Sequence, residues 1–146
     1  MAIKDPVQRF GICWLFFGYA VALHVLDEAG NDFLSVYNPN ALILRRTLPF
    51  LPVPVFTFPQ WVGSLALGLA LWLALTPMAF RGVKWLRFLA MPMAVLAGIG
   101  NGLAHILSSI YFGRFMPVVF SSPLLLLAGT VLLRSAMDKG SATTVK

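Results

Sequence analysis

The chain has 146 residues, of which 59% are hydrophobic and only 11% are charged. Soluble domains carry about 25% charged residues, so this composition excludes an ordinary soluble protein and indicates one membrane domain. The net charge of +6 does not indicate nucleic-acid binding, because the basic residues are spread between apolar runs, as in the loops of membrane proteins. Cys13 is the only cysteine, so an intramolecular disulfide is excluded.

The first apolar run, residues 10–29, is long enough to cross a bilayer, which requires about 20 mostly apolar residues. Basic residues before it also fit a signal peptide. However, the run ends in His24, Asp27 and Glu28, and no small-residue cleavage site follows it. We therefore expect this segment to remain as the first membrane-spanning helix.

The next segment, from Gly30 to Gln60, contains five prolines among apolar and aromatic residues. It is too broken for a spanning helix and too apolar for a solvated linker. The sequence therefore predicts a long Pro-rich loop that lies at the membrane interface as a cap, with a short amphipathic helix around Ala41–Arg46.

Three further apolar runs, at residues 61–80, 87–111 and 115–133, predict three more spanning helices. The loops between them are short, which favours antiparallel neighbours. The predicted fold is therefore all-α: a four-transmembrane-helix bundle within residues 1–138, with the Pro-rich interfacial loop between its first and second helices. Residues 139–146 are expected to form a disordered tail.

The basic residues predict how this bundle is oriented. Eight of them fall on one side of the four-span topology: Lys4, Arg9, Arg81, Lys84, Arg87, Arg134, Lys139 and Lys146. The other three are Arg45, Arg46 and Arg114. Because basic loops stay in the cytoplasm, both termini are expected inside. The tryptophans are expected to be interface anchors and lipid-facing bulk: Trp14, Trp61, Trp72 and Trp85.

Polar side chains inside two of the predicted spans are the candidates for chemistry. An ionisable residue costs about 2.5–3.5 kcal/mol at the bilayer centre, so those present are usually functional. His24 and Glu28 lie one helical turn apart on one face of the first helix, with Asp27 beside them. Asn101 and His105 repeat this spacing in the third helix.

The helical rise of 1.5 Å per residue brings the two pairs to one level. Counted from the cytoplasmic ends, His24 and Asn101 lie at about 21 and 20 Å, and His105 and Glu28 at about 26 and 27 Å. We therefore expect one polar site in the outer leaflet, below the cap. Its catalytic candidates are Glu28, His24, Asp27, Asn101 and His105. Its substrate-binding candidates are Gln60, Ser64, Ser108, Ser121, Ser122 and Tyr19.

Four interpretations of this site remain open. His24, Glu28 and His105 offer imidazole and carboxylate ligands that suit one zinc or iron ion, with Asp27 orienting a ligating histidine. Alternatively, Glu28 exchanges protons without a metal, and the histidines relay them while Asn101 orients the substrate. The site could also be a structural hydrogen-bond network or part of a lipophile-binding or transport protein.

Both catalytic interpretations predict hydrolysis, isomerisation or cyclisation of a lipophilic small molecule, such as a terpenoid or a sterol-like compound. Membrane lipid is the other expected partner, and the oligomeric state is left open.

The segment Leu23-His24-Val25-Leu26-Asp27-Glu28 resembles the motif of the small bacterial integral membrane proteins named for H-x-x-E-E, with Asp27 in place of the first glutamate. Those proteins are also similar in a later span with Asn and His one turn apart, as Asn101 and His105 are here. The resemblance implies a bacterial inner-membrane location and a site, but no particular reaction. The His24-x-x-x-Glu28 spacing is also similar to that of sterol-isomerase (emopamil-binding) type proteins, which move protons on a hydrocarbon skeleton.

Overall fold

The structure, a computed structural model, describes residues 5–113, 115 and 118–138, and these residues form helices and no strand. The helices are α1 (Pro6–Gly30), α2 (Phe33–Thr47), α3 (Phe58–Ala74), α4 (Thr76–Phe80), α5 (Lys84–Met93), the π-helix η1 (Ala94–Gly100), α6 (Asn101–Tyr111) and α7 (Ser122–Met137). The tail predicted at residues 139–146 lies outside the described residues.

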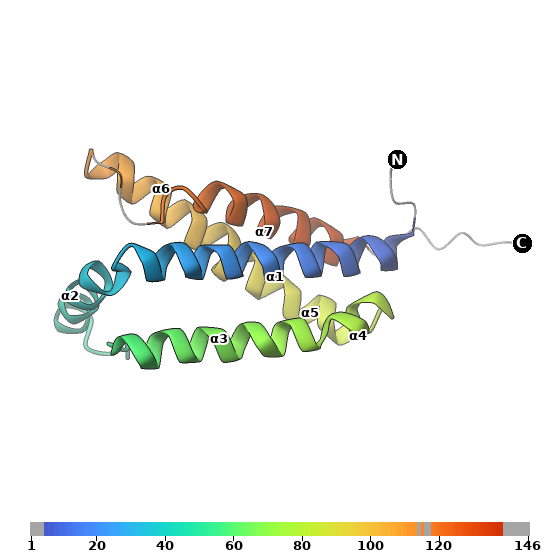
Figure 1. The fold of residues 1–146 in the computed structure, drawn as a ribbon, viewed down its shortest axis with the longest axis horizontal. Helices are drawn as coiled ribbons and strands as arrows, with labels where there is room; N and C mark the ends of the chain where they lie inside the picture. Colours follow the sequence, from blue (N-terminus) through green and yellow to red (C-terminus); the bar gives the residue numbers. More distant parts are fainter. Residues whose placement is uncertain (1–4, 114, 116–117, 139–146) are drawn as a thin grey trace, which may run out of the picture.

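Three helical segments are long and apolar enough to cross a membrane, which indicates a membrane protein. They are Pro6–Gly30, Phe58–Phe80 and Lys84–Tyr111. Each contains one of the predicted spans. In Figure 1 they run back and forth, and α7 returns beside α1. The described part is therefore an all-helical antiparallel bundle.

The predicted start of the fourth span, residues 115–133, was wrong. Residues 118–121 form turns, and the helix α7 begins only at Ser122 and ends at Met137. Val118 has a φ of 76°, a left-handed backbone conformation that interrupts a helix, and Pro123 suits the first turn of a new one. With 16 residues, α7 is about 24 Å long, which is shorter than the other three segments.

The long connection also differs from the prediction. Instead of a short helix around Ala41–Arg46, it contains the 15-residue helix α2, with Pro39 inside it. Side chains of α2 hold the extended chain that follows: Asn38 donates to the carbonyl of Phe56 at 2.9 Å and accepts from its N–H at 3.1 Å. Tyr37 donates to the Pro54 carbonyl at 3.0 Å. The Pro-rich segment is thus a folded cap across one end of the bundle, between α1 and α3 (Figure 1).

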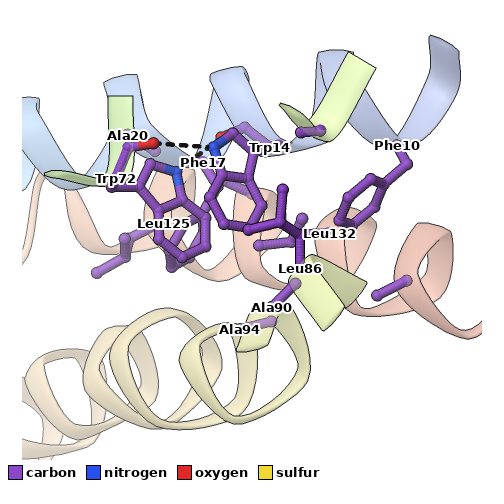
Figure 2. Packing of buried hydrophobic residues seen from close by; sticks show 13 residues of the cluster. Phe10, Trp14, Phe17, Ala20, Trp72, Leu86, Ala90, Ala94, Leu125 and Leu132 are labelled. Carbon is purple, nitrogen blue, oxygen red and sulfur yellow. Dashed lines mark hydrogen bonds between the residues drawn. The ribbon is translucent and has the colours of Figure 1, made fainter. Parts of the chain in front are cut away.

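Aromatic and small residues of α1 build the core. The rings of Trp14 and Trp72 stack with centroids 3.6 Å apart, and each indole N–H donates to the other residue's backbone carbonyl at 3.1 Å (Figure 2). A Cβ at Gly18 would lie 3.0 Å from the Trp72 ring, so the glycine makes room for it. Both tryptophans are therefore core residues, and the prediction of lipid-facing anchors was wrong for them.

Glycines bring the third membrane-length segment against α7. A Cβ on Gly98 would lie 2.8 Å from the Cα of Gly129, and one on Gly102 would lie 2.9 Å from the Ser122 carbonyl oxygen. Small residues permit this close backbone approach in membrane helices. Gly102 thereby brings the start of α6, next to Asn101, against the start of α7.

Arg87 joins three helix ends at the opposite end of the bundle from the cap. Its guanidinium donates to the carbonyls of Ser135, Asp138 and Pro6 at 2.7, 2.8 and 3.3 Å, and Arg9 pairs with the Asp138 carboxylate. The start of α1 and the end of α7 therefore lie side by side. The carbonyl oxygens at the C-terminus of α7, which lack partners within the helix, are bonded by this cation.

Candidate functional site

Two of the candidate side chains come from the last turns of α1. His24 and Glu28 point from one face of the helix into the bundle and are only 2% and 5% exposed. Few partners for such side chains exist in an apolar core, so each buried polar atom requires a contact from another helix. These contacts come from α6 and from the residues just before α7.

Asn101 and His105 approach from α6, directly after the π-helix η1. The Nε2 atom of His105 lies 3.6 Å from Glu28 Oε1, and so does the Nε2 atom of His24. The two imidazole rings meet edge to face with centroids 5.1 Å apart. The structure therefore brings together the two i, i+4 pairs, although they are about 77 residues apart in the sequence.

The ligand atoms of His24, Glu28 and His105 all lie within 4.8 Å of one another, so this group could hold a metal ion. Zinc–nitrogen bonds of about 2.0–2.1 Å correspond to about 3.3–3.4 Å between tetrahedral ligands. The two nitrogen–oxygen distances of 3.6 Å are only slightly longer. The ligand atoms of the group, which lie up to 4.8 Å apart, would have to move closer together to reach these distances.

Asp27 acts on this group through Ser121. Its Oδ2 accepts from the hydroxyl of Ser121 at 2.7 Å and from the backbone N–H at 3.2 Å, and its Oδ1 accepts from Asn31 at 2.8 Å. A hydroxyl has one hydrogen to donate, and the Ser121 hydroxyl donates it to Asp27 Oδ2. Ser121 Oγ, 2.9 Å from His24 Nδ1, must then accept from that nitrogen.

This chain of bonds fixes the tautomer of His24. With the proton on Nδ1, Nε2 carries the lone pair and is free to accept a hydrogen bond. Asn101 Nδ2 lies 3.1 Å from Nε2 and donates to it. A metal ion on Nε2 would replace this bond, and the Asn101 amide would then be free to bind water or substrate.

Pockets lie on both sides of the cluster, beneath the cap. One, of about 480 Å³, is bounded by Glu28, Asp32, Phe33 and Trp61, among others. The other, of about 230 Å³, includes Asn101, His105 and Phe33. The ring of Phe33 lies 5.6 Å from that of His105 and separates the two spaces. Glu28, Asn101 and His105 thus border spaces that α2 also lines.

The structure places the predicted substrate-binding residues in different surroundings. Ser108 lines the smaller pocket, and Ser121 contacts the cluster. Ser122 is buried, and its hydroxyl donates a hydrogen bond to the Val118 carbonyl. The remaining three are not brought to the cluster: Gln60 caps α3, Ser64 bonds to the Trp61 carbonyl, and Tyr19 is 58% exposed.

Sequence reasoning did not identify Phe33, Asp32 and Trp61 as parts of the site. A signal for Phe33 was present, because Phe33, Tyr37 and Ala41 repeat at helical spacing and form one apolar face of α2. Asp32 and Trp61 had no such signal, since their positions depend on how the cap folds back.

The comparisons with known proteins add no further constraint: no protein family, no curated protein and no solved structure matches the chain.

Proposed function

We propose that this chain is a membrane-embedded enzyme that uses His24, Glu28 and His105 to act on a lipophilic small molecule. The observation that carries the proposal is the buried group of two imidazoles and one carboxylate, whose ligand atoms lie within 4.8 Å. Burying ionisable groups in a membrane costs free energy, so those that are present usually serve a function. The adjoining pockets give a substrate access to them.

The proposal includes four spans, with α7 as the fourth, and both termini in the cytoplasm of a bacterium. The basic residues support this orientation, because eight of the eleven fall on the side of the termini. The His/Glu/His group then lies in the outer leaflet, and the cap lies at the outer surface. A short α7 is compatible with a span, since the bilayer thins locally around short helices at modest cost.

In the favoured form of this proposal, the three side chains hold one zinc or iron ion. Such an ion activates a water molecule or polarises a substrate oxygen, which suits hydrolysis best. Asp27 and Ser121 keep His24 Nε2 directed at the ion. Asn101 orients the water or the substrate, and the apolar walls exclude bulk water.

The bond from Asn101 to His24 Nε2 favours a second candidate, acid–base catalysis without metal. Glu28 then takes a proton from one carbon of the substrate and returns it, directly or through His24 and His105, to another carbon, so that no proton is gained or lost. For such a relay, the 3.6 Å separations between Glu28 and the histidines must shorten to hydrogen-bond length. This chemistry suits isomerisation or cyclisation. A non-catalytic transport protein is less well supported. In the described helices, the buried ionisable groups are confined to the cap end, so a polar path reaches only one face.

Metal content separates the two catalytic candidates. The detergent-purified chain is expected to contain close to one zinc or iron ion, measured by elemental analysis, and His105→Ala should lose it. Thr130→Ala is the matched control, because Thr130 bonds to its own helix at the Leu126 carbonyl, away from the cluster. Substoichiometric metal that does not respond to His105→Ala would contradict the metal site and leave the acid–base candidate.

Turnover tests the role of Glu28 in either form. For a lipophilic substrate that the wild-type chain converts, Glu28→Gln is expected to reduce kcat by about 100-fold or more, because the amide cannot accept a proton or bind metal as a carboxylate does. KM should change little, since the glutamine side chain has nearly the same size and shape as glutamate. Normal kcat in Glu28→Gln would refute the proposed mechanism.

A further inference from the structure

The larger of the two pockets beside the cluster, of about 480 Å³, has mostly aromatic and acidic side chains at its wall. Four aromatic side chains line it: Phe33, Phe56, Phe58 and Trp61. Three of them form a continuous wall, with Trp61 between Phe58 and Phe33 at centroid distances of 5.9 and 6.0 Å. The faces of aromatic rings attract cations, and clusters of them bind quaternary ammonium groups.

The charges around this wall have one sign. Glu28 and Asp32 line the pocket, and among the residues that the structure describes no Lys, Arg or His does so. This is unusual in a chain with 11 basic and only 5 acidic residues. Asp32 is exposed, and within the described part of the chain its carboxylate has no hydrogen-bond or ion-pair partner. Its charge is therefore available to a ligand at the pocket mouth.

From this combination we infer that the pocket binds the ammonium group of a lipophilic amine or quaternary ammonium compound, the substrate class of the proposed enzyme. The cation lies against Trp61 and Phe33, with Asp32 at the mouth. Glu28, at the inner end, also contacts both histidines, so the bound molecule extends toward the reactive group. Placing the cation near Asp32 keeps it away from a metal ion at the other side of Glu28. That the bound molecule is also a substrate rests on the proposed function. Binding of the ammonium group itself does not require catalysis.

Two amphiphiles of nearly equal shape test this. Dodecyltrimethylammonium carries a positive charge, whereas dodecyldimethylamine oxide at pH 8 has a dipolar head without net charge. Calorimetric titration of the full chain in maltoside detergent is expected to show about tenfold or greater preference for the cation. Equal affinity for the two compounds would overturn the inference.

Variants identify the groups responsible. Asp32→Asn and Trp61→Leu should each remove most of the preference, whereas Trp85→Leu, at the other end of the bundle, should keep it. Asp32 is exposed, so Asp32→Asn tests the inference even if Trp61→Leu fails to fold. A preference that survives Asp32→Asn unchanged would contradict the assigned site.

Metal content in the same samples keeps the two proposals distinguishable. One metal per chain without cation preference refutes only the ammonium site. Cation preference without a metal that responds to His105→Ala refutes only the metal site.

Discussion

Ser121 is the residue that connects the acidic and the imidazole parts of the site. Its hydroxyl stands between Asp27 Oδ2, at 2.7 Å, and His24 Nδ1, at 2.9 Å. Groups in this position set the tautomer and ring orientation of a ligating histidine and increase metal affinity. We therefore assign Ser121 a positioning role, which is distinct from the substrate-binding role expected from the sequence.

Ser121→Ala is expected to weaken metal binding about 10–100-fold, because His24 loses the acceptor that holds its proton on Nδ1. The number of metal ions bound at saturation should stay the same, since the three ligands remain. Competition with a chelator of known affinity measures the change.

Ser122→Ala is the matched control, because the Ser122 hydroxyl bonds to the Val118 carbonyl at 2.7 Å and does not contact the histidine. Equal metal affinity in the two variants would show that the Ser121 bridge has no influence on the site.

At the scale of single residues, helical spacing was sufficient to predict the central group. His24 with Glu28, and Asn101 with His105, each repeat at one turn, and the rise per residue placed them at one depth. The Ser121 bridge was not predictable, because it depends on the left-handed turn at Val118, a β-branched residue that rarely adopts a positive φ. A sequence pattern gives no indication of such a turn.

Among the helices, the contact between Gly98 and Gly129 determines how closely α7 approaches the third membrane-length segment. Gly98→Ala would put a Cβ 2.8 Å from the Gly129 backbone, and backbone cannot give way as a side chain does. We expect a loss of about 1–3 kcal/mol in the free energy of unfolding, as for overpacked cores. Unfolding in mixed detergent micelles with increasing SDS measures it.

Gly63→Ala on α3 provides the comparison, because a Cβ there would meet nothing within 4 Å. It should be neutral or stabilising, since Ala is the better helix former. A Gly98→Ala variant as stable as Gly63→Ala would contradict the close packing of these helices.

The helices themselves were predictable to different degrees. The three membrane-length segments follow from long apolar runs. The helix α2 was predicted too short, as a helix around Ala41–Arg46, because five prolines in this segment suggested a broken chain, yet Pro39 alone lies inside it. Its stability comes from tertiary bonds, such as those from Asn38 to Phe56. The π-helix η1 was also not foreseen, although π segments often occur beside functional sites.

For the whole molecule, the proposed topology can be tested by labelling single cysteines in intact cells. The only natural cysteine is first removed as Cys13→Ser. Leu51→Cys in the cap is expected to react with an impermeant maleimide, whereas Lys4→Cys, Lys84→Cys and Lys146→Cys should react only after permeabilisation. The physical reason is the retention of basic loops in the cytoplasm.

The four positions control for one another, because each is accessible in one compartment only. Reaction of any of the three lysine replacements in intact cells, or protection of Leu51→Cys, would contradict the orientation with both termini inside.

The bond between His24 and Ser121 joins positions 97 residues apart, which has a consequence for biosynthesis. A ribosome adds about 5–20 residues per second, so Ser121 is synthesised about 5–20 s after His24. During that interval Asp27 and His24 lack the hydroxyl that later bridges them, and α1 has not yet met α7. Assembly of the site is therefore one of the last steps in the maturation of the chain, and until then Asp27 has only nearby partners such as Asn31.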